Sequence, residues 1–178
     1  MAVYEFEGKK PVISKHAFIH PDAVIIGAVT IEGEVFMGPG AVIRADFGSV
    51  LIKDGVSIQD NVVIHVDAGV HVVIENETII GHGAILHDVV IGRGCIIGMG
   101  SVLLPGVSCG EGAVVAAGSM VPQGTHIPAG KLAAGNPAHI IKDVSPKLAA
   151  RARTGSAAYR ELTRRYRTSL KPCDKATE

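Results

Sequence analysis

Residues 91–127 read IGRGCIIGMGSVLLPGVSCGEGAVVAAGSMVPQGTHI, and this stretch decides the fold. A residue with a small or aliphatic apolar side chain recurs at every sixth position, namely Ile91, Ile97, Leu103, Cys109, Val115, Val121 and Ile127. A period of six matches neither the 3.6-residue period of an amphipathic helix nor the two-residue alternation of a strand. It is typical of a hexapeptide β-helix, in which three hexads complete one triangular coil of about 18 residues.

The same period extends toward the N-terminus, with three irregularities. Three extra residues follow Ile43, four extra residues follow Ile64, and one residue is missing after Leu86. About 20 hexads predict six to seven coils, stacked about 4.8 Å apart by parallel hydrogen-bond ladders. We therefore predict an all-β fold, a left-handed parallel β-helix over residues 1–140, with a C-terminal α-helical segment and tail over residues 141–178. The left hand is an expectation from hexapeptide-repeat proteins, not from counting.

The C-terminal segment carries a helix signal. Ser145 and Pro146 form a good N-cap and N1 pair, which opens a helix expected to run to about Arg153. Gly155 is expected to break it, and a second helical segment is expected to end near Leu170. The expected apolar face of that second segment comprises Tyr159, Leu162, Tyr166 and Leu170. Arginines predicted to form a solvated basic face are Arg160, Arg164, Arg165 and Arg167.

Composition narrows the class of protein. Lys+Arg and Asp+Glu both number 17, so the charge balance gives no indication of nucleic acid or an anionic membrane as a partner. Glycine interrupts every apolar run before the roughly 18 residues of a membrane span, and the first residues do not resemble a signal peptide. The three cysteines have no CxxC spacing, so buried free thiols and a cytoplasmic location are expected.

Two histidines fall in one column of the predicted coil. Arg44, His65 and His87 each directly follow a repeat position, and these positions lie one coil apart once the extra residues are removed. The three side chains should therefore stack on the outside of consecutive coils, about 4.8 Å apart. Two imidazoles at that spacing can share a metal ion, with metal–nitrogen distances of about 2.1 Å.

His82 is expected on a different face. It follows Ile80 by two positions and belongs to the hexad before the one that carries His87. A trimer of side-by-side prisms would bring His82 of one chain to His65 and His87 of the next. The sequence thus predicts a metal site between subunits with a fourth position open for water. The remaining histidines are interpreted as surface residues: His16, His20, His71, His126 and His139.

Further polar residues lie near these positions. Gln59 and Asp60 lie one coil before the His82 hexad, on the same face. An amide such as that of Gln59, close to the open metal position, can form a hydrogen bond with metal-bound hydroxide. Arg44 and Asp46 are expected to form a charge pair between neighbouring chains. The alternative for all four is simple pairing across a trimer interface.

Three segments resemble the γ-class carbonic anhydrase family: RADFG at 44–48, QDNVVIH at 59–65 and GHGAILH at 81–87. The start VYEFEGKKPVI and the ending AAGNPA are similar to the PaaY- and CaiE-type branch of that family. Three imidazoles and a water molecule also suit Fe²⁺ or Co²⁺. The resemblance implies a homotrimer that binds Zn²⁺. It implies the metal ligands His65, His82 and His87, with His82 coming from the neighbouring subunit. It also implies a catalytic group made up of Arg44, Asp46, Gln59, Asp60 and Tyr159.

The activity implied by the resemblance is reversible hydration of CO₂ to bicarbonate by metal-bound hydroxide. One departure from the family concerns proton transfer. The founding enzymes carry a glutamate directly after R-x-D and another in an acidic loop, whereas this chain has Phe47 and a loop with only Asp67 and His71. A slow enzyme is therefore expected.

Other functions stay open on the sequence alone. The same site suits a metal-dependent acyl-CoA thioesterase of PaaY type, with the C-terminal arginines meeting CoA phosphates. The fold also suits a hexapeptide acyltransferase. A non-catalytic trimeric scaffold with structural zinc is the remaining alternative.

Overall fold

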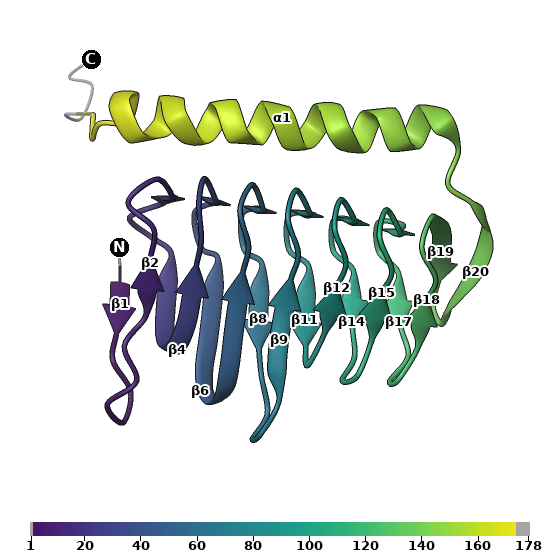
Figure 1. The fold of residues 1–178 in the computed structure, drawn as a ribbon, viewed down its shortest axis with the longest axis horizontal. Helices are drawn as coiled ribbons and strands as arrows, with labels where there is room; N and C mark the ends of the chain where they lie inside the picture. The colour runs from purple at the N-terminus through teal and green to yellow at the C-terminus, as the bar shows by residue number, and fades with distance from the viewer. Residues whose placement is uncertain (1, 174–178) are drawn as a thin grey trace, which may run out of the picture.

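The computed structural model describes residues 2–173 of the 178-residue chain. Short parallel strands stack into a β-solenoid of about seven turns, and one long helix lies along its side (Figure 1). The expected class, a β-helix of hexapeptide repeats with a C-terminal helix, is confirmed.

The solenoid has three faces, which we name for what they carry. The histidine face consists of β8 (Val63–His65), β11 (Ile85–His87), β14 (Val102–Leu103) and β17 (Met120–Val121). The loop face consists of β9 (His71–Ile74), β12 (Val90–Ile91), β15 (Ser108–Cys109) and β18 (His126–Ile127). The helix face consists of β3 (Phe18–Ile19), β5 (Phe36–Met37), β7 (Ser57–Ile58), β10 (Ile79–Ile80), β13 (Ile96–Ile97), β16 (Val114–Val115) and β19 (Lys131–Gly135).

Two longer strands join the first two faces into one sheet. β4 (Val24–Ile31) and β6 (Val42–Ile52) each begin on the histidine face and end on the loop face. At the N-terminal end, β1 (Ala2–Tyr4) and β2 (Val12–Ile13) pair with β4. At the other end, β20 (Ala138–Asp143) pairs antiparallel with β19, so the predicted boundary at residue 140 falls inside a strand.

The register confirms the hexad count. Ile43 pairs with Ile64, and Ile64 pairs with Leu86, so the extra residues bulge out without shifting the ladder. Arg44 therefore stands beside His65, and His65 stands beside His87.

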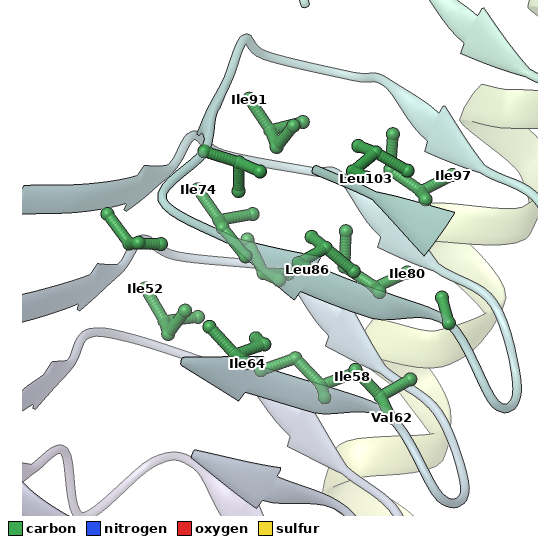
Figure 2. Packing of buried hydrophobic residues seen from close by; sticks show 14 of the residues in the cluster. Ile52, Ile58, Val62, Ile64, Ile74, Ile80, Leu86, Ile91, Ile97 and Leu103 are labelled. Atoms are coloured by element: carbon green, nitrogen blue, oxygen red, sulfur yellow. The ribbon is translucent and has the colours of Figure 1, made fainter. Parts of the chain in front are cut away.

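The interior of the prism is filled by the repeat positions. Side chains such as Ile58, Ile64, Ile80 and Leu86 have no exposed surface, and they stack coil upon coil toward the axis (Figure 2). Burial of these branched side chains stabilises each by about 1.5–3 kcal/mol relative to an exposed position. The described strands that carry them contain only two or three residues in most coils, so stability comes from stacking rather than from any strand alone.

The helix is continuous, which corrects the predicted break. α1 (Pro146–Ser169) begins at the N-cap Ser145, whose side chain accepts a hydrogen bond from the Leu148 amide. Gly155 lies inside α1, where a Cβ would come within 3.0 Å of the Ile79 side chain. Glycine costs a helix about 1 kcal/mol, a cost that packing against the solenoid can offset.

α1 lies on the helix face, and an aromatic cluster holds its C-terminal half. Tyr166 contacts Phe18 and Phe36 with ring centroids 5.0 and 5.5 Å apart, and Tyr159 contacts Phe36 at 5.3 Å. The predicted apolar face is thus confirmed for both tyrosines, whereas Leu170 is 44% exposed.

Two of the four arginines predicted to be solvated instead pair with the solenoid. Arg160 donates to Glu34 and Asp54 at 3.2 and 2.8 Å, and Arg164 donates to both oxygens of Glu34 at 2.6 and 2.8 Å. The hydrogen bond from Arg164 and the one from Arg160 outweigh desolvation, and together they lower the pKa of Glu34. The acidic groups on the coils were not recognised as partners, because sequence spacing does not show which prism corner the helix covers.

The cysteine prediction holds for two of three residues. Cys95 and Cys109 are buried free thiols, and burial raises their pKa to about 11 and about 12, which makes them unreactive near neutral pH. Cys173 is exposed. Among residues 2–173, no helix is long and apolar enough to cross a membrane.

Replacing Ile80 with Ala should lower the free energy of unfolding by about 2–5 kcal/mol, because it opens a cavity in a rigid stack. Urea unfolding followed by circular dichroism measures this. Val90→Ala is the matched control, since Val90 is 49% exposed on the loop face. Equal losses in the two variants would contradict the assignment of repeat positions to the core.

Replacing Glu34 with Gln should lower the free energy of unfolding by about 1 kcal/mol at pH 7. The folded-state pKa of Glu34 is lowered, so its stabilisation is complete above the unfolded value of about 4.5 and disappears as the pH falls through the folded value. Unfolding curves at pH 7, 5, 4 and 3 should therefore converge for the two proteins at low pH. Glu5→Gln is the control, since Glu5 pairs with Lys10 away from α1. A constant difference between wild type and Glu34→Gln at every pH would contradict this account.

Candidate metal centre

His65 and His87 form a pair at the ends of β8 and β11. The Nδ1 atom of His65 lies 2.9 Å from the Nε2 atom of His87, and the ring centroids are 4.8 Å apart. The parallel ladder between the two strands fixes this approach, as the sequence predicts.

A carboxylate lies against the outer nitrogen of each ring. Asp46 Oδ1 is 3.1 Å from His65 Nε2, and Asp88 Oδ2 is 3.2 Å from His87 Nδ1. The second contact lacks the alignment of a hydrogen bond, and His87 Nδ1 is buried without another partner. Because a carboxylate favours the N–H tautomer at the nitrogen facing it, the hydrogen bond with Asp46 leaves a lone pair on His65 Nδ1 that points toward His87 Nε2. The space between the two rings therefore suits either a proton carried by His87 Nε2 or a cation bound by both nitrogens.

The donor set fits a divalent cation. Two nitrogens bound to a tetrahedral Zn²⁺ at about 2.05 Å lie about 3.3 Å apart, close to the observed separation of His65 and His87. Histidines that bind metals usually give their other nitrogen to a carboxylate or carbonyl, as His65 does to Asp46, and Asp88 lies at 3.2 Å from the corresponding nitrogen of His87.

Asp46 is held in its ionised form. Desolvation opposes ionisation, but the hydrogen bonds with Arg44 and His65 outweigh it and lower the pKa of Asp46. Arg44 Nη1 lies 2.5 Å from Asp46 Oδ2 within the same chain. The predicted pairing of these residues between chains stays a prediction.

A third potential ligand comes from the four-residue insertion. The ligand atoms of His65, Asp67 and His87 all lie within 4.8 Å of one another. Asp67 Oδ1 is 3.9 Å from His87 Nε2. Sequence reasoning noted Asp67 only as a loop acid, and it did not single out Asp88. The hexad after Leu86 is one residue short, and this irregularity could have pointed to Asp88. In the structure Asp88 lies in the shortened turn with a φ angle of 53°.

His82 lies apart from this pair, as predicted for a single chain. It occupies the turn between β10 and β11, outside the cluster formed by His65, Asp67 and His87. Its backbone N–H donates to Gln59 Oε1 at 3.2 Å, and its Nδ1 lies 3.1 Å from Asp60 Oδ2. The structure thus brings Gln59 and Asp60 to His82 rather than to the histidine pair.

Two aromatic residues occupy different positions around these groups. Phe47 is 58% exposed and contacts the His65 ring edge-on, with centroids 6.2 Å apart. Tyr159 packs on the helix face, where desolvation and then the nearby charge of Asp60 raise its pKa. Tyr159 therefore lies on the side of Asp60, and its catalytic role stays a prediction.

The fold and its surface columns define a class, the parallel β-solenoids built of hexapeptide repeats. A family model described as bacterial transferase hexapeptide (six repeats) matches residues 71–105 and 88–123. A hexapeptide transferase family protein from Anaplasma phagocytophilum is 32% identical, with a TM-score of 0.88 over 93% of this chain and 98% of that one. The chain belongs to the hexapeptide-repeat transferase family.

Two other relatives refine the comparison. A Bacillus cereus protein described as a candidate acetyltransferase is 32% identical, with a TM-score of 0.85 over 95% of this chain and 98% of that one. The carnitine operon protein CaiE of Escherichia coli is 45% identical over 58 residues. That match spans 33% of this chain and 30% of the CaiE protein.

Proposed function

We propose that the chain is a metal-dependent, γ-class carbonic anhydrase-like enzyme that hydrates CO₂ reversibly to bicarbonate. Zn²⁺, or Fe²⁺ or Co²⁺ in its place, is held by His65 and His87 together with His82 of the partner subunit. The protein acts as a homotrimer in this proposal. The names of its relatives refer to transferases or to an operon, and none of them names this reaction. The basis for the proposed reaction is therefore the histidine site.

One observation carries the proposal: all three histidines have a carboxylate against one ring nitrogen. The pairs are His65 with Asp46, His87 with Asp88, and His82 with Asp60, at 3.1, 3.2 and 3.1 Å. A histidine that binds a metal uses such a partner to fix its tautomer and increase its basicity, and the contact is a hydrogen bond at His65.

An outward apolar column supports assembly beside the histidines. Val42 pairs with Val63, Val63 with Ile85, and Ile85 with Val102; the first three lie two residues before Arg44, His65 and His87. Val63 and Ile85 are 37% and 46% exposed in the single chain. A continuous apolar stripe of this kind is typical of a surface that another chain covers.

When bound, a zinc ion at such a site lowers the pKa of water to about 7 and acts as a Lewis acid. The residues of the chain then position the reactants. Gln59 is 6% exposed, and because its oxygen accepts from His82, its amide N–H groups are the donors left for a substrate oxygen. Phe47 gives the pair an apolar wall suited to CO₂, but it cannot carry a proton away, so turnover is expected to be slow.

A second candidate is acyl transfer or thioester hydrolysis, which the transferase names of two relatives favour. The exposed Phe47 beside His65 would suit an apolar acyl group. Binding of CoA phosphates by the C-terminal arginines is less favoured than the sequence suggested, because Arg160 and Arg164 are paired with Glu34.

Mixing two inactive variants should restore activity if the site lies between subunits. His82→Ala and His87→Ala chains, unfolded and refolded together at equal amounts, should form hybrid trimers in which roughly a quarter of the sites are intact. Stopped-flow CO₂ hydration on zinc-loaded protein should then recover about a quarter of the wild-type rate.

Each variant refolded alone is the control and should stay inactive. Circular dichroism and sedimentation should show that both fold and assemble as the wild type does. Inactive hybrids that contain zinc would contradict the intersubunit site.

The second candidate predicts chelator-sensitive release of thiol from acyl-CoA substrates. A panel of short-chain, long-chain and aryl acyl-CoAs, assayed with and without chelator, measures it. The proposed function expects little release compared with CO₂ hydration. Strong, chelator-sensitive hydrolysis without CO₂ hydration would instead favour the thioesterase.

A further inference from the structure

The loop that carries Asp67 is built to hold its carboxylate beside the histidine pair. Asp67 is 60% exposed, yet its backbone N–H donates to Asp88 Oδ1 at 2.7 Å. The other oxygen of Asp88 lies 3.2 Å from His87 Nδ1, and the Asp88 side chain is only 8% exposed. One buried carboxylate therefore positions both His87 and the Asp67 backbone.

Strand β6, which contains the extra residues after Ile43, packs against the Asp67 loop. A Cβ on Gly48 would lie 2.3 Å from the Val70 carbonyl oxygen and 2.7 Å from that of Asp67. Only glycine allows β6 and the Asp67 loop to pack this closely, backbone against backbone. The Val70 amide closes the Asp67 turn by donating to the Asp67 carbonyl at 3.2 Å. The backbone at Asp67 is therefore held by the fold, and its carboxylate Oδ1 lies 3.9 Å from His87 Nε2.

We propose that a single chain binds a divalent cation through His65, His87 and Asp67, before His82 of the partner subunit reaches it. The inference rests on the metal centre of the proposed function but not on its reaction. Two imidazoles and one carboxylate suit Zn²⁺, and the same set with open positions suits Fe²⁺ or Co²⁺. In a chain on its own, no fourth protein ligand is needed for the remaining positions, which water can fill.

The negative charge of Asp67 distinguishes it from the neutral imidazole of His82 as a ligand. Asp67 neutralises one of the two positive charges of the ion, which strengthens binding and weakens its action as a Lewis acid. An imidazole from the partner subunit leaves the full charge in place. Asp67 thus serves to capture the ion, and His82 of the partner subunit replaces Asp67 in the reactive site, which leaves the fourth position for water.

Four full-length proteins test the inference: wild type, His82→Ala, Asp67→Asn and the double variant. Each is loaded with Zn²⁺, dialysed, and analysed for zinc per chain. The inference expects His82→Ala to keep close to one ion per chain, and the double variant to bind at least about a hundredfold more weakly. Co²⁺ loading gives a second readout, because its visible absorption in His82→Ala should disappear once Asp67 is also replaced.

Asp22→Asn is the matched control, since Asp22 is an exposed acid that faces a different histidine, His20, at 3.7 Å. It should change neither zinc content nor the Co²⁺ spectrum. A His82→Ala protein as empty as the double variant would overturn the inference, and so would a double variant that keeps its ion. If the four proteins bind zinc as expected but the wild type does not hydrate CO₂, only the proposed reaction is refuted. Active wild type with an empty His82→Ala variant would refute only this inference.

Discussion

The parallel ladder between coils is the constraint on which the rest of the molecule depends. It places each residue directly beside its counterpart one coil away, so a side chain on the surface belongs to a column with fixed spacing. His65 and His87 face each other at 2.9 Å because Ile64 and Leu86 are in register inside the prism. The apolar core and the candidate metal centre are therefore two sides of the same strands.

The irregularities of the repeat are as informative as the repeat itself. The extra residues after Ile43 lie within β6, those after Ile64 form a loop, and the ladder stays intact while the two segments pack against each other at Gly48. The shortened turn after Leu86 places the Asp88 carboxylate where it accepts a hydrogen bond from the Asp67 amide and lies beside the His87 ring. A regular hexad in any of these places would remove a group from the surroundings of the histidine pair.

Hexad counting from the sequence was enough to find the column of Arg44, His65 and His87, and to separate His82 from it. Counting works there because the period is a property of the backbone. It did not reveal that α1 would pass Gly155 unbroken, since that depends on the Ile79 side chain beneath it. The pairing of Glu34 with two arginines, and the role of Asp88, depend on the same kind of local geometry.

The central claim is that the two facing ring nitrogens of His65 and His87 bind a metal ion. A crystal structure of zinc-loaded protein, with anomalous difference density at the zinc edge, tests it most directly. The account predicts a peak within about 2.1 Å of His65 Nδ1 and His87 Nε2, at a subunit boundary that His82 of the partner subunit also reaches. A zinc-soaked crystal with the two rings in contact and no peak between them would contradict it.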